Sequence, residues 1–256
     1  MRWIELRCLP MVALILTGAA GQARAADLHV IVANSVRAAL LRIAPIYEHR
    51  TGDRIDLAAG LSGGGGPNSI PARLAHGMAA DVLVILRPDL DRLVAKGLAV
   101  RGSTADIARA RVASLVREDA SVGDLASPAG LRAALLLAQS IVYPDGGSGA
   151  FVSHTLFRRL GVQDAVAGHM HEIKGRPIAG VVSEGRATIG FQQISEIGDV
   201  RGLRIVPLPP SLQMPDALAA GVATATRDRT ASARFVAFLS SAAAQEAIVA
   251  SGLGRP

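Results

Sequence analysis

The 256-residue chain is 50% hydrophobic but only 3% aromatic, so its core is built mainly from Ala, Val, Leu and Ile. This composition suits helices packed on a parallel sheet better than an aromatic-rich binding surface. The net charge of +6 is scattered along the chain, with no basic block interleaved with aromatics, which argues against a nucleic-acid partner and favours a small anionic ligand.

The N-terminus has the pattern of a secretory signal, expected to span residues 1–25. Two arginines come before an apolar stretch over residues 8–20, and Ala23-Arg24-Ala25 forms a small-x-small cleavage site. The stretch is too short for a transmembrane anchor. Because Cys8 is the only cysteine, the mature chain, which begins near Ala26 or Asp27, is expected to be cysteine-free, periplasmic and monomeric.

The first hundred residues predict three strand–helix units. Short apolar runs are typical of buried strands, and each is followed by apolar residues at helical spacing. Three such units in a row imply a parallel, doubly wound sheet with right-handed crossovers. The expected strands are Leu28–Ala33, Ile55–Ala59 and Asp81–Leu86, and the expected helices are Val36–His49, one from near Asn68 to Gly77, and one from Pro88.

From Arg111 the pattern changes, and no Pro/Gly/Ser linker separates two complete domains. We therefore expect two lobes, residues 26–110 with 212–256 and residues 111–211, joined by chain crossings near 110 and 212. Strands are expected at Val112–Val116, Ser140–Tyr143, Ala187–Phe191, Ile205–Leu208 and Ala217–Val222, and helices at Pro128–Leu137, Ser148–Leu160, Ile178–Glu184, Ala231–Leu239 and Ala242–Val249.

Two glycine-rich stretches lie at strand-to-helix junctions. The first, Leu61–Ser69, contains four consecutive glycines, which bring backbone N–H groups close to a ligand, and Asn68 or Ser69 can cap the next helix. No lysine follows the glycines, so the nucleotide P-loop pattern is absent. A flexible loop is the alternative for one such run. The second stretch, Asp145–Ala150, makes an anion site the better interpretation.

Three junctions share one chemistry: Asn34-Ser35, Ser62-Gly63 and Ser148-Gly149 each place a hydroxyl or amide and N–H groups at an expected helix start. Helix starts carry unpaired donors and a partial positive charge, so several that converge can hold a dehydrated oxyanion without a buried cation. Serine is also a common structural cap, so each junction alone has that second interpretation. Taken as a set, they indicate a ligand site.

Catalytic and metal signals are weak. The six histidines are dispersed without carboxylate or cysteine partners at metal-ligand spacing, so no metal or cofactor is expected, and His169 and His171 are interpreted as surface residues. Ser148 stands in Gly-Gly-Ser-Gly-Ala rather than in a Gly-x-Ser-x-Gly elbow. Asp145 and Glu196 adjoin the expected cleft and could abstract a proton, but a turn residue and a helix-surface residue are the preferred interpretations.

Two glutamines close a predicted strand in the segment Gly190–Ile194. Ligands of open α/β sheets bind beyond the carboxyl ends of the strands, so at least one of Gln192 and Gln193 is expected to face the cleft.

The ordered set of these pieces resembles the periplasmic molybdate-binding proteins of ABC transporters, over essentially the whole mature chain. The closing helix segment is shared by many solute-binding proteins, whereas the full set is more specific. The matching pieces are Asn34–Leu40, Ser62-Gly63, Pro71–Leu74, Ala79–Val84, Glu184–Gly190 and Phe235–Gln245.

The resemblance implies an α/β, two-lobed type II periplasmic binding protein, in which each lobe is a mostly parallel sheet flanked by helices and the ligand cleft lies between lobes that close by a hinge. It also implies a ligand contact near Gly175-Arg176 and favours Gln193 over Gln192. The candidate ligand-binding residues are Asn34, Ser35, Ser62, Gly63, Ser148, Gly149, Arg176 and Gln193.

Four departures from the family pattern favour a larger or differently shaped anion. Gln193 stands where the family usually has tyrosine, Ser148 where it has alanine, and Gly175 where it has valine; the glycine run is longer. A branch that includes the periplasmic aconitate isomerases has similar pieces, namely Ile70–Leu74, Ser148-Gly149 and Ile189–Glu196.

The expected function is a periplasmic receptor that captures a molybdate-like oxyanion or a carboxylate for an ABC permease, with Arg73 or Arg176 as a charge partner. An aconitate isomerase-like enzyme, which moves a double bond in a tricarboxylate by proton transfer, is the alternative, and the sequence identifies no catalytic base for it. A sensor domain that passes ligand occupancy to a partner is a third interpretation.

Overall fold

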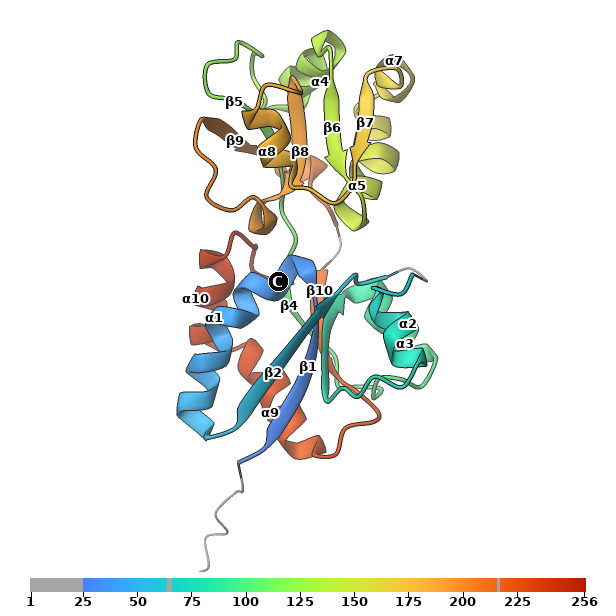
Figure 1. Ribbon diagram of the computed structural model, residues 1–256, viewed down its shortest axis with the longest axis vertical. Coiled ribbons are helices and arrows are strands. Elements are labelled where there is room, and N and C mark those ends of the chain that lie inside the picture. The colour runs from blue at the N-terminus through green and yellow to red at the C-terminus, as the bar shows by residue number, and fades with distance from the viewer. Residues whose placement is uncertain (1–24, 64–65, 216) are drawn as a thin grey trace, which may run out of the picture.

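The computed structural model describes residues 25–63, 66–215 and 217–256 (Figure 1). Apart from Ala25, the expected signal segment lies outside the described residues, as do Gly64 and Gly65 of the glycine run. In the described part, no single helix is long and apolar enough to cross a membrane; α9 (Arg229–Leu239) and α10 (Ala242–Ala250) reach that composition only together, and they are bent by 60°.

Lobe 1 is built on the sheet β2-β1-β3-β10-β4. β2, β1 and β3 run parallel, whereas β10 is antiparallel to both of its neighbours, β3 and β4. Helices α1, α9 and α10 cover one face of this sheet, and α2 and α3 cover the other (Figure 1). The bounds are β1 Asp27–Ala33, α1 Asn34–Thr51, β2 Arg54–Gly60, α2 Ile70–Ala75, β3 Val82–Leu86, α3 Arg87–Ala95, β4 Ala105–Arg109 and β10 Ala217–Val222.

Lobe 2 is built on the sheet β7-β6-β8-β5-β9. β7, β6 and β8 are parallel, and β5 is antiparallel to β8 and β9. The bounds are β5 Val112–Arg117, α4 Pro128–Leu137, β6 Ile141–Pro144, α5 Gly147–Phe151, the π-helical turn η1 Val152–Leu156, α6 Phe157–Arg159, α7 Gln163–Val166, β7 Met170–Ile173, α8 Ile178–Ser183, β8 Ile189–Gln193, the 3-10 turn η2 Ile194–Glu196, β9 Leu203–Pro207 and the 3-10 turn η3 Pro210–Leu212.

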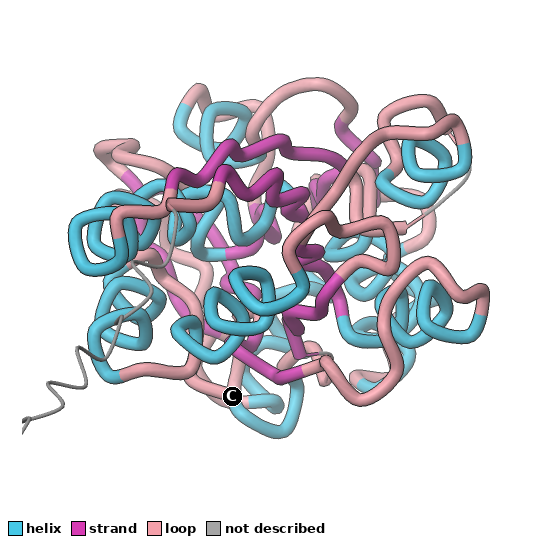
Figure 2. Tube along the Cα trace, turned by 90° about the horizontal axis from the view of Figure 1, so that it is seen from below, coloured by secondary structure: helices cyan, strands magenta, loops and turns pink. Residues whose placement is uncertain are grey.

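Alternation along β5 shows why lobe 2 has a core on each face of its sheet. Val112 and Val116 pack with α4 and the α5–α6 segment, whereas Ala113 and Leu115 pack with α8. Neighbouring side chains of a strand point to opposite faces, so a run of apolar residues requires cover on both sides. Viewed along the long axis, helices surround the strands (Figure 2).

The predicted two-lobed α/β fold is confirmed, but the sheets are mixed rather than mostly parallel: among the described residues, each sheet has two parallel and two antiparallel pairings. The chain passes from one sheet to the other between β4 and β5 and again between β9 and β10. An isolated bridge between Arg109 and Gly254 brings the C-terminal segment to the first of these crossings. The parallel strands of both lobes place their carboxyl ends toward the space between the lobes.

Two strands, β4 and β7, had no signal in the sequence. Both are edge strands, and both carry charged residues: Asp106 in β4 pairs with Arg87 at 2.7 Å, and His171 and Glu172 of β7 are exposed. An edge strand buries less of its surface, so it needs no continuous apolar run. The helix predicted over Ser148–Leu160 forms, but η1 interrupts its α-helical bonding.

Candidate functional site

A cleft of about 360 Å³ lies between the lobes. In lobe 1 its wall is formed by the segments that follow β1, β2 and β3. In lobe 2 its wall is formed by the segments that follow β6 and β8 and by the loop before α8. Ligands of α/β sheets bind at such carboxyl ends. The lining residues are Ala33–Ser35, Gly60–Ser62, Leu86, Pro144–Ser148, Gly175–Ile178, Gln192, Gln193, Glu196 and Met214.

The N-terminus of α1 opens into this cleft without a side-chain cap. Ala33 is the N-cap residue, and no side-chain hydrogen bond caps the helix. Asn34 and Ser35, which the sequence suggested as caps, are instead its first two helical residues. Among the described residues the first-turn N–H groups therefore have no capping side chain, and an 18-residue helix directs its positive end at the cleft.

The N-terminus of α5 opens into the cleft from lobe 2, and glycines set its geometry. The N-cap residue Gly146 has φ +97°, a conformation that other residues rarely adopt, and no side chain caps the helix. A Cβ on Gly149 would lie 1.6 Å from the carbonyl oxygen of Pro144, so only glycine fits this turn. The glycines are thus structural requirements of an ordered turn that leaves Ser148 in the cleft wall.

Ser62 lines the cleft, but the prediction that Ser62-Gly63 begins a helix is wrong. The next helix, α2, begins at Ile70 and is capped by Ser69, whose Oγ accepts from the N–H of Ala72. The Ser62 hydroxyl donates to Oδ2 of Asp89 at 2.8 Å and accepts from the N–H of Leu86 at 2.9 Å. In this conformation its only proton is used, so the hydroxyl cannot donate to an anion.

Gly63 and Gly149 lie beside the cleft rather than in its lining. A Cβ on Gly63 would approach Oδ1 of Asp89 to 2.7 Å, which explains glycine at this position by close packing. Of the eight candidate residues, the structure gathers the other six in one cleft: Asn34, Ser35, Ser62, Ser148, Arg176 and Gln193.

Both glutamines line the cleft, and each is 4% exposed. Gln192 belongs to lobe 2 alone: its Oε1 accepts from the N–H of Ala179 in α8, and its Nε2 donates to the carbonyl of Glu196, both at 2.9 Å. Gln192 thereby satisfies a first-turn donor of α8. No local sequence signal identified this capping role, because the two residues are 13 positions apart.

Gln193 connects the lobes. Its Nε2 donates to the carbonyl of Ser35 at 3.2 Å and to Oγ of Ser195 at 2.7 Å, and Ser195 Oγ donates to the same carbonyl at 2.8 Å. The start of α1 in lobe 1 is therefore held by two side chains of lobe 2. This arrangement couples the position of the α1 donors to the separation of the lobes.

Charged groups surround the cleft unevenly. Arg176 lines it and pairs with Glu184 at 2.7 Å, whereas Arg73 lies outside the lining and donates to the carbonyl of Ala59. Asp145 and Glu196 both line the cleft. Glu196 is an exposed residue, yet the protein around its carboxyl displaces water and raises its pKa.

This geometry suits an anion that accepts hydrogen bonds. Two uncapped helix starts, one from each lobe, meet in the same cleft with amide and hydroxyl groups around them. Among the described residues no cluster of His, Cys, Asp and Glu could hold a metal ion.

Comparisons with known proteins agree with this architecture. The family model described as bacterial extracellular solute-binding protein matches residues 28–254. An aconitate isomerase from a Pseudomonas species is 34% identical over 227 residues, which cover 88% of this chain and 87% of that protein.

Solved structures show the same fold at low sequence identity. The substrate-binding domain of a putative molybdenum ABC transporter from Clostridium difficile superposes with a TM-score of 0.76 at 17% identity, covering 91% of this chain and 100% of that one. The periplasmic molybdate-binding protein of Azotobacter vinelandii superposes with a TM-score of 0.69 at 19% identity, covering 90% and 99%.

Proposed function

Because the chain belongs to the family of bacterial extracellular solute-binding proteins, we propose that it captures a small anion in the interlobe cleft and delivers it to an ABC permease. The observation that carries this proposal is the meeting of two uncapped helix starts, α1 and α5, from opposite lobes. The binding residues are Asn34, Ser35, Ser148, Arg176 and Gln193, with Ser62 contributing to the wall.

The ligand class that we propose is an organic carboxylate rather than a single tetrahedral oxyanion. The cleft volume of about 360 Å³ falls in the range of roughly 300–1,000 Å³ that is typical of sites for organic ligands. An extended carboxylate can place its charged groups at the helix starts and its carbon skeleton between them.

The proposed setting is the periplasm, with the protein acting as a monomer after its signal is removed. Family membership and the transporter neighbours support this setting. We place the lobes at residues 26–110 with 212–256 and at 111–211, because the crossings between the two sheets lie at these positions. Movement about these crossings opens and closes the cleft.

Thermal unfolding with a panel of anions tests the ligand class. Citrate and trans-aconitate are compared with molybdate, tungstate and sulfate at equal ionic strength. A ligand at about 100 times its Kd adds about 2.7 kcal/mol to the unfolding free energy, which raises Tm by several degrees. Stabilisation by the carboxylates alone supports the proposal, whereas stabilisation by molybdate alone overturns the carboxylate class.

An isomerase is the second candidate, favoured by the 34% identical relative and by the position of Glu196 in the cleft. A carboxyl group with a raised pKa can accept a proton from an acidic carbon and return it to another carbon. In this scheme one C–H bond breaks and another forms, so the double bond of aconitate moves with no net gain or loss of atoms. Glu196 is the proposed base.

Proton exchange separates the two candidates. The protein is incubated with cis- or trans-aconitate in D₂O, and deuterium incorporation and the other isomer are followed by NMR. For an isomerase, both appear with the wild-type protein, and Glu196→Gln binds the substrate but forms neither. Binding without deuterium or isomer rejects the enzyme and leaves the receptor.

A further inference from the structure

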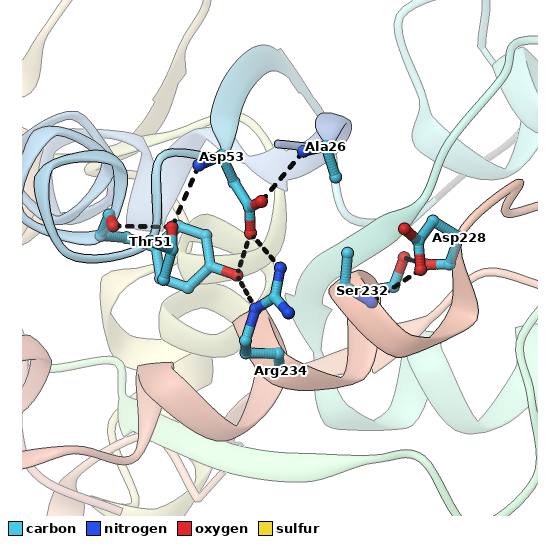
Figure 3. A network of polar contacts seen from close by, with 8 residues as sticks. Ala26, Thr51, Asp53, Asp228, Ser232 and Arg234 are labelled. Carbon is cyan, nitrogen blue, oxygen red and sulfur yellow. Dashed lines mark hydrogen bonds and ion pairs between the residues drawn. The ribbon is translucent and has the colours of Figure 1, made fainter. Parts of the chain in front are cut away.

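A polar network lies at the end of lobe 1 remote from the cleft, where β1 begins (Figure 3). At its centre is Asp53, whose side chain is buried with 2% exposed. Its Oδ2 accepts from the Tyr47 hydroxyl at 2.8 Å and from Nη2 of Arg234 at 2.6 Å. Arg234 also donates through Nε to the Tyr47 oxygen at 3.2 Å. This oxygen of Asp53 therefore accepts two hydrogen bonds from side chains of the protein.

The second oxygen, Oδ1, lies at the start of the described residues. It accepts from the backbone nitrogen of Ala26 at 2.9 Å, and the carbonyl of Ala26 accepts from the N–H of Arg54 at 2.8 Å. Ala25 is exposed, whereas Ala26 packs partly against the lobe 1 core. The buried carboxylate therefore accepts from one particular backbone nitrogen, that of Ala26.

We propose that the chain is cleaved between Ala25 and Ala26 by an endopeptidase and that Asp53 binds the new N-terminus. Hydrolysis adds one water molecule, leaves a carboxylate on Ala25 and frees the amine of Ala26, which takes up a proton. A single amide donor at 2.9 Å from Oδ1 is thereby replaced by an ammonium group with a full positive charge. The small-x-small sequence Ala23-Arg24-Ala25 places the scissile bond at the same position independently.

The geometry also decides between the two start residues that the sequence allows. Cleavage one residue later, before Asp27, would remove the nitrogen that Oδ1 contacts and leave this oxygen without its donor. A buried acceptor without a donor is destabilising. Burial alone would raise the pKa of Asp53, but the hydrogen bonds from Ala26, Arg234 and Tyr47 outweigh it and lower the pKa.

The ion pair has a defined pH dependence. An α-amino group ordinarily has a pKa of about 7.7–8.0, and pairing with Asp53 raises it in the folded state. The added stability is therefore complete below about pH 7.7 and is lost as the pH rises through the folded pKa. The charged or titratable groups of the surrounding elements are Arg37, Arg42, Tyr47, Glu48, His49 and Arg50 of α1, Asp27 and His29 of β1, Arg54 and Asp56 of β2, and Arg229 and Arg234 of α9.

Histidine ordinarily titrates at about pH 6.5, below the amine, and the other side-chain types ordinarily titrate below about pH 5 or above about pH 9. Burial is the largest effect on Tyr47, and it raises the pKa of that hydroxyl further above the range in which the amine titrates. A change in stability over this interval that depends on Asp53 therefore reports the amine.

The experiment has two parts. Mass spectrometry of the exported protein is expected to find Ala26 as the first residue. Two chains, one starting at Ala26 and one at Ala25, are then compared by thermal unfolding from pH 6.5 to 9.5. The Ala26 chain is expected to have a Tm about 3–5 °C higher at pH 6.5, the shift that one pKa unit produces in a chain of this size, and the advantage should vanish at high pH.

Asp53→Asn should abolish the difference between the two chains, whereas Asp56→Asn, at an exposed carboxylate on the same strand, should preserve it. Should Asp53→Asn not fold, the pH dependence of the two wild-type chains decides alone. An exported protein that starts elsewhere, or equal Tm values for the two chains at all pH values, overturns the proposal.

Discussion

The polar groups at the two ends of helix α1 differ in whether they have hydrogen-bond partners in the protein. At its start, in the cleft, the first-turn N–H groups have no capping side chain. At its other end, Tyr47 and the neighbouring Asp53 lie in a network in which both carboxylate oxygens have donors. Backbone donors without acceptors can bind a ligand, whereas a carboxylate that already accepts from protein donors stabilises the fold. Lobe 1 thus places the donors of the proposed site and a stabilising network at opposite ends of one helix.

The largest expected effect is at the C-terminal end of α1, where the network around Asp53 lies. Asp53→Ala removes the acceptor shared by Tyr47 and Arg234, and we expect a loss of about 2–4 kcal/mol in unfolding free energy, because partners of a buried charge are left unpaired. The 39% exposure of Arg234 limits the loss, since water reaches the guanidinium. Urea unfolding measures it, and ligand affinity of the folded protein should be unchanged. A weakened affinity would contradict the separation of the two ends.

Gly149→Ala tests whether the turn before α5 is needed for binding. The new Cβ would lie 1.6 Å from the Pro144 carbonyl oxygen, so the start of α5 must move. We expect a loss of about 1–3 kcal/mol in stability, together with weaker ligand binding by calorimetry. Gly168→Ala is the matched control, because a Cβ there meets nothing within 4 Å. Equal behaviour of the two variants would show that the turn tolerates movement.

Ser148→Ala should weaken binding without altering the fold. Ser148 lines the cleft, and loss of one hydrogen bond to the anion is expected to cost about 0.5–1.5 kcal/mol, or roughly 2–12-fold in Kd. The Tm without ligand should stay within about 1 °C of wild type, because surface substitutions have small effects. Ser121→Ala, at an exposed loop serine, serves as the control. Unchanged affinity would exclude the Ser148 hydroxyl from the site.

The smallest effect is expected from the pH dependence of the two carboxyl groups. Donors around Asp53 outweigh burial and lower its pKa, so its stabilisation is lost as the pH falls through that value. The protein around the carboxyl of Glu196 displaces water and raises its pKa, so wild type loses stability relative to Glu196→Gln as the pH rises through the pKa of Glu196. Thermal unfolding from pH 3 to 8 should show opposite trends for Asp53→Asn and Glu196→Gln. If the stability of both variants relative to wild type changed in the same direction with pH, the proposed difference between the two carboxyl groups would be wrong.

The sequence predicted the elements whose signal is local. Buried strands such as β3 are continuous apolar runs, and the residues that follow them reach the cleft because parallel strands end at one edge. Edge strands β4 and β7 lack that signal. The hydrogen bond from the Ser62 hydroxyl to Asp89 connects residues 27 positions apart, and so does the hydrogen bond from Ala26 to Asp53. Pairings at such separations depend on the folded arrangement, which no local pattern encodes.

The carbonyl of Ser35 accepts hydrogen bonds from Gln193 and Ser195 of lobe 2, and the N–H on the other side of the same peptide group belongs to Val36 in the first turn of α1. Hydrogen bonds to a carbonyl polarise its amide and strengthen the N–H as a donor. In the proposed site, the contact between the lobes and the binding of an anion by the start of α1 therefore involve the same amide group. Under the proposed function, separation of the lobes would break these hydrogen bonds and weaken that N–H as a donor to the ligand at the same time.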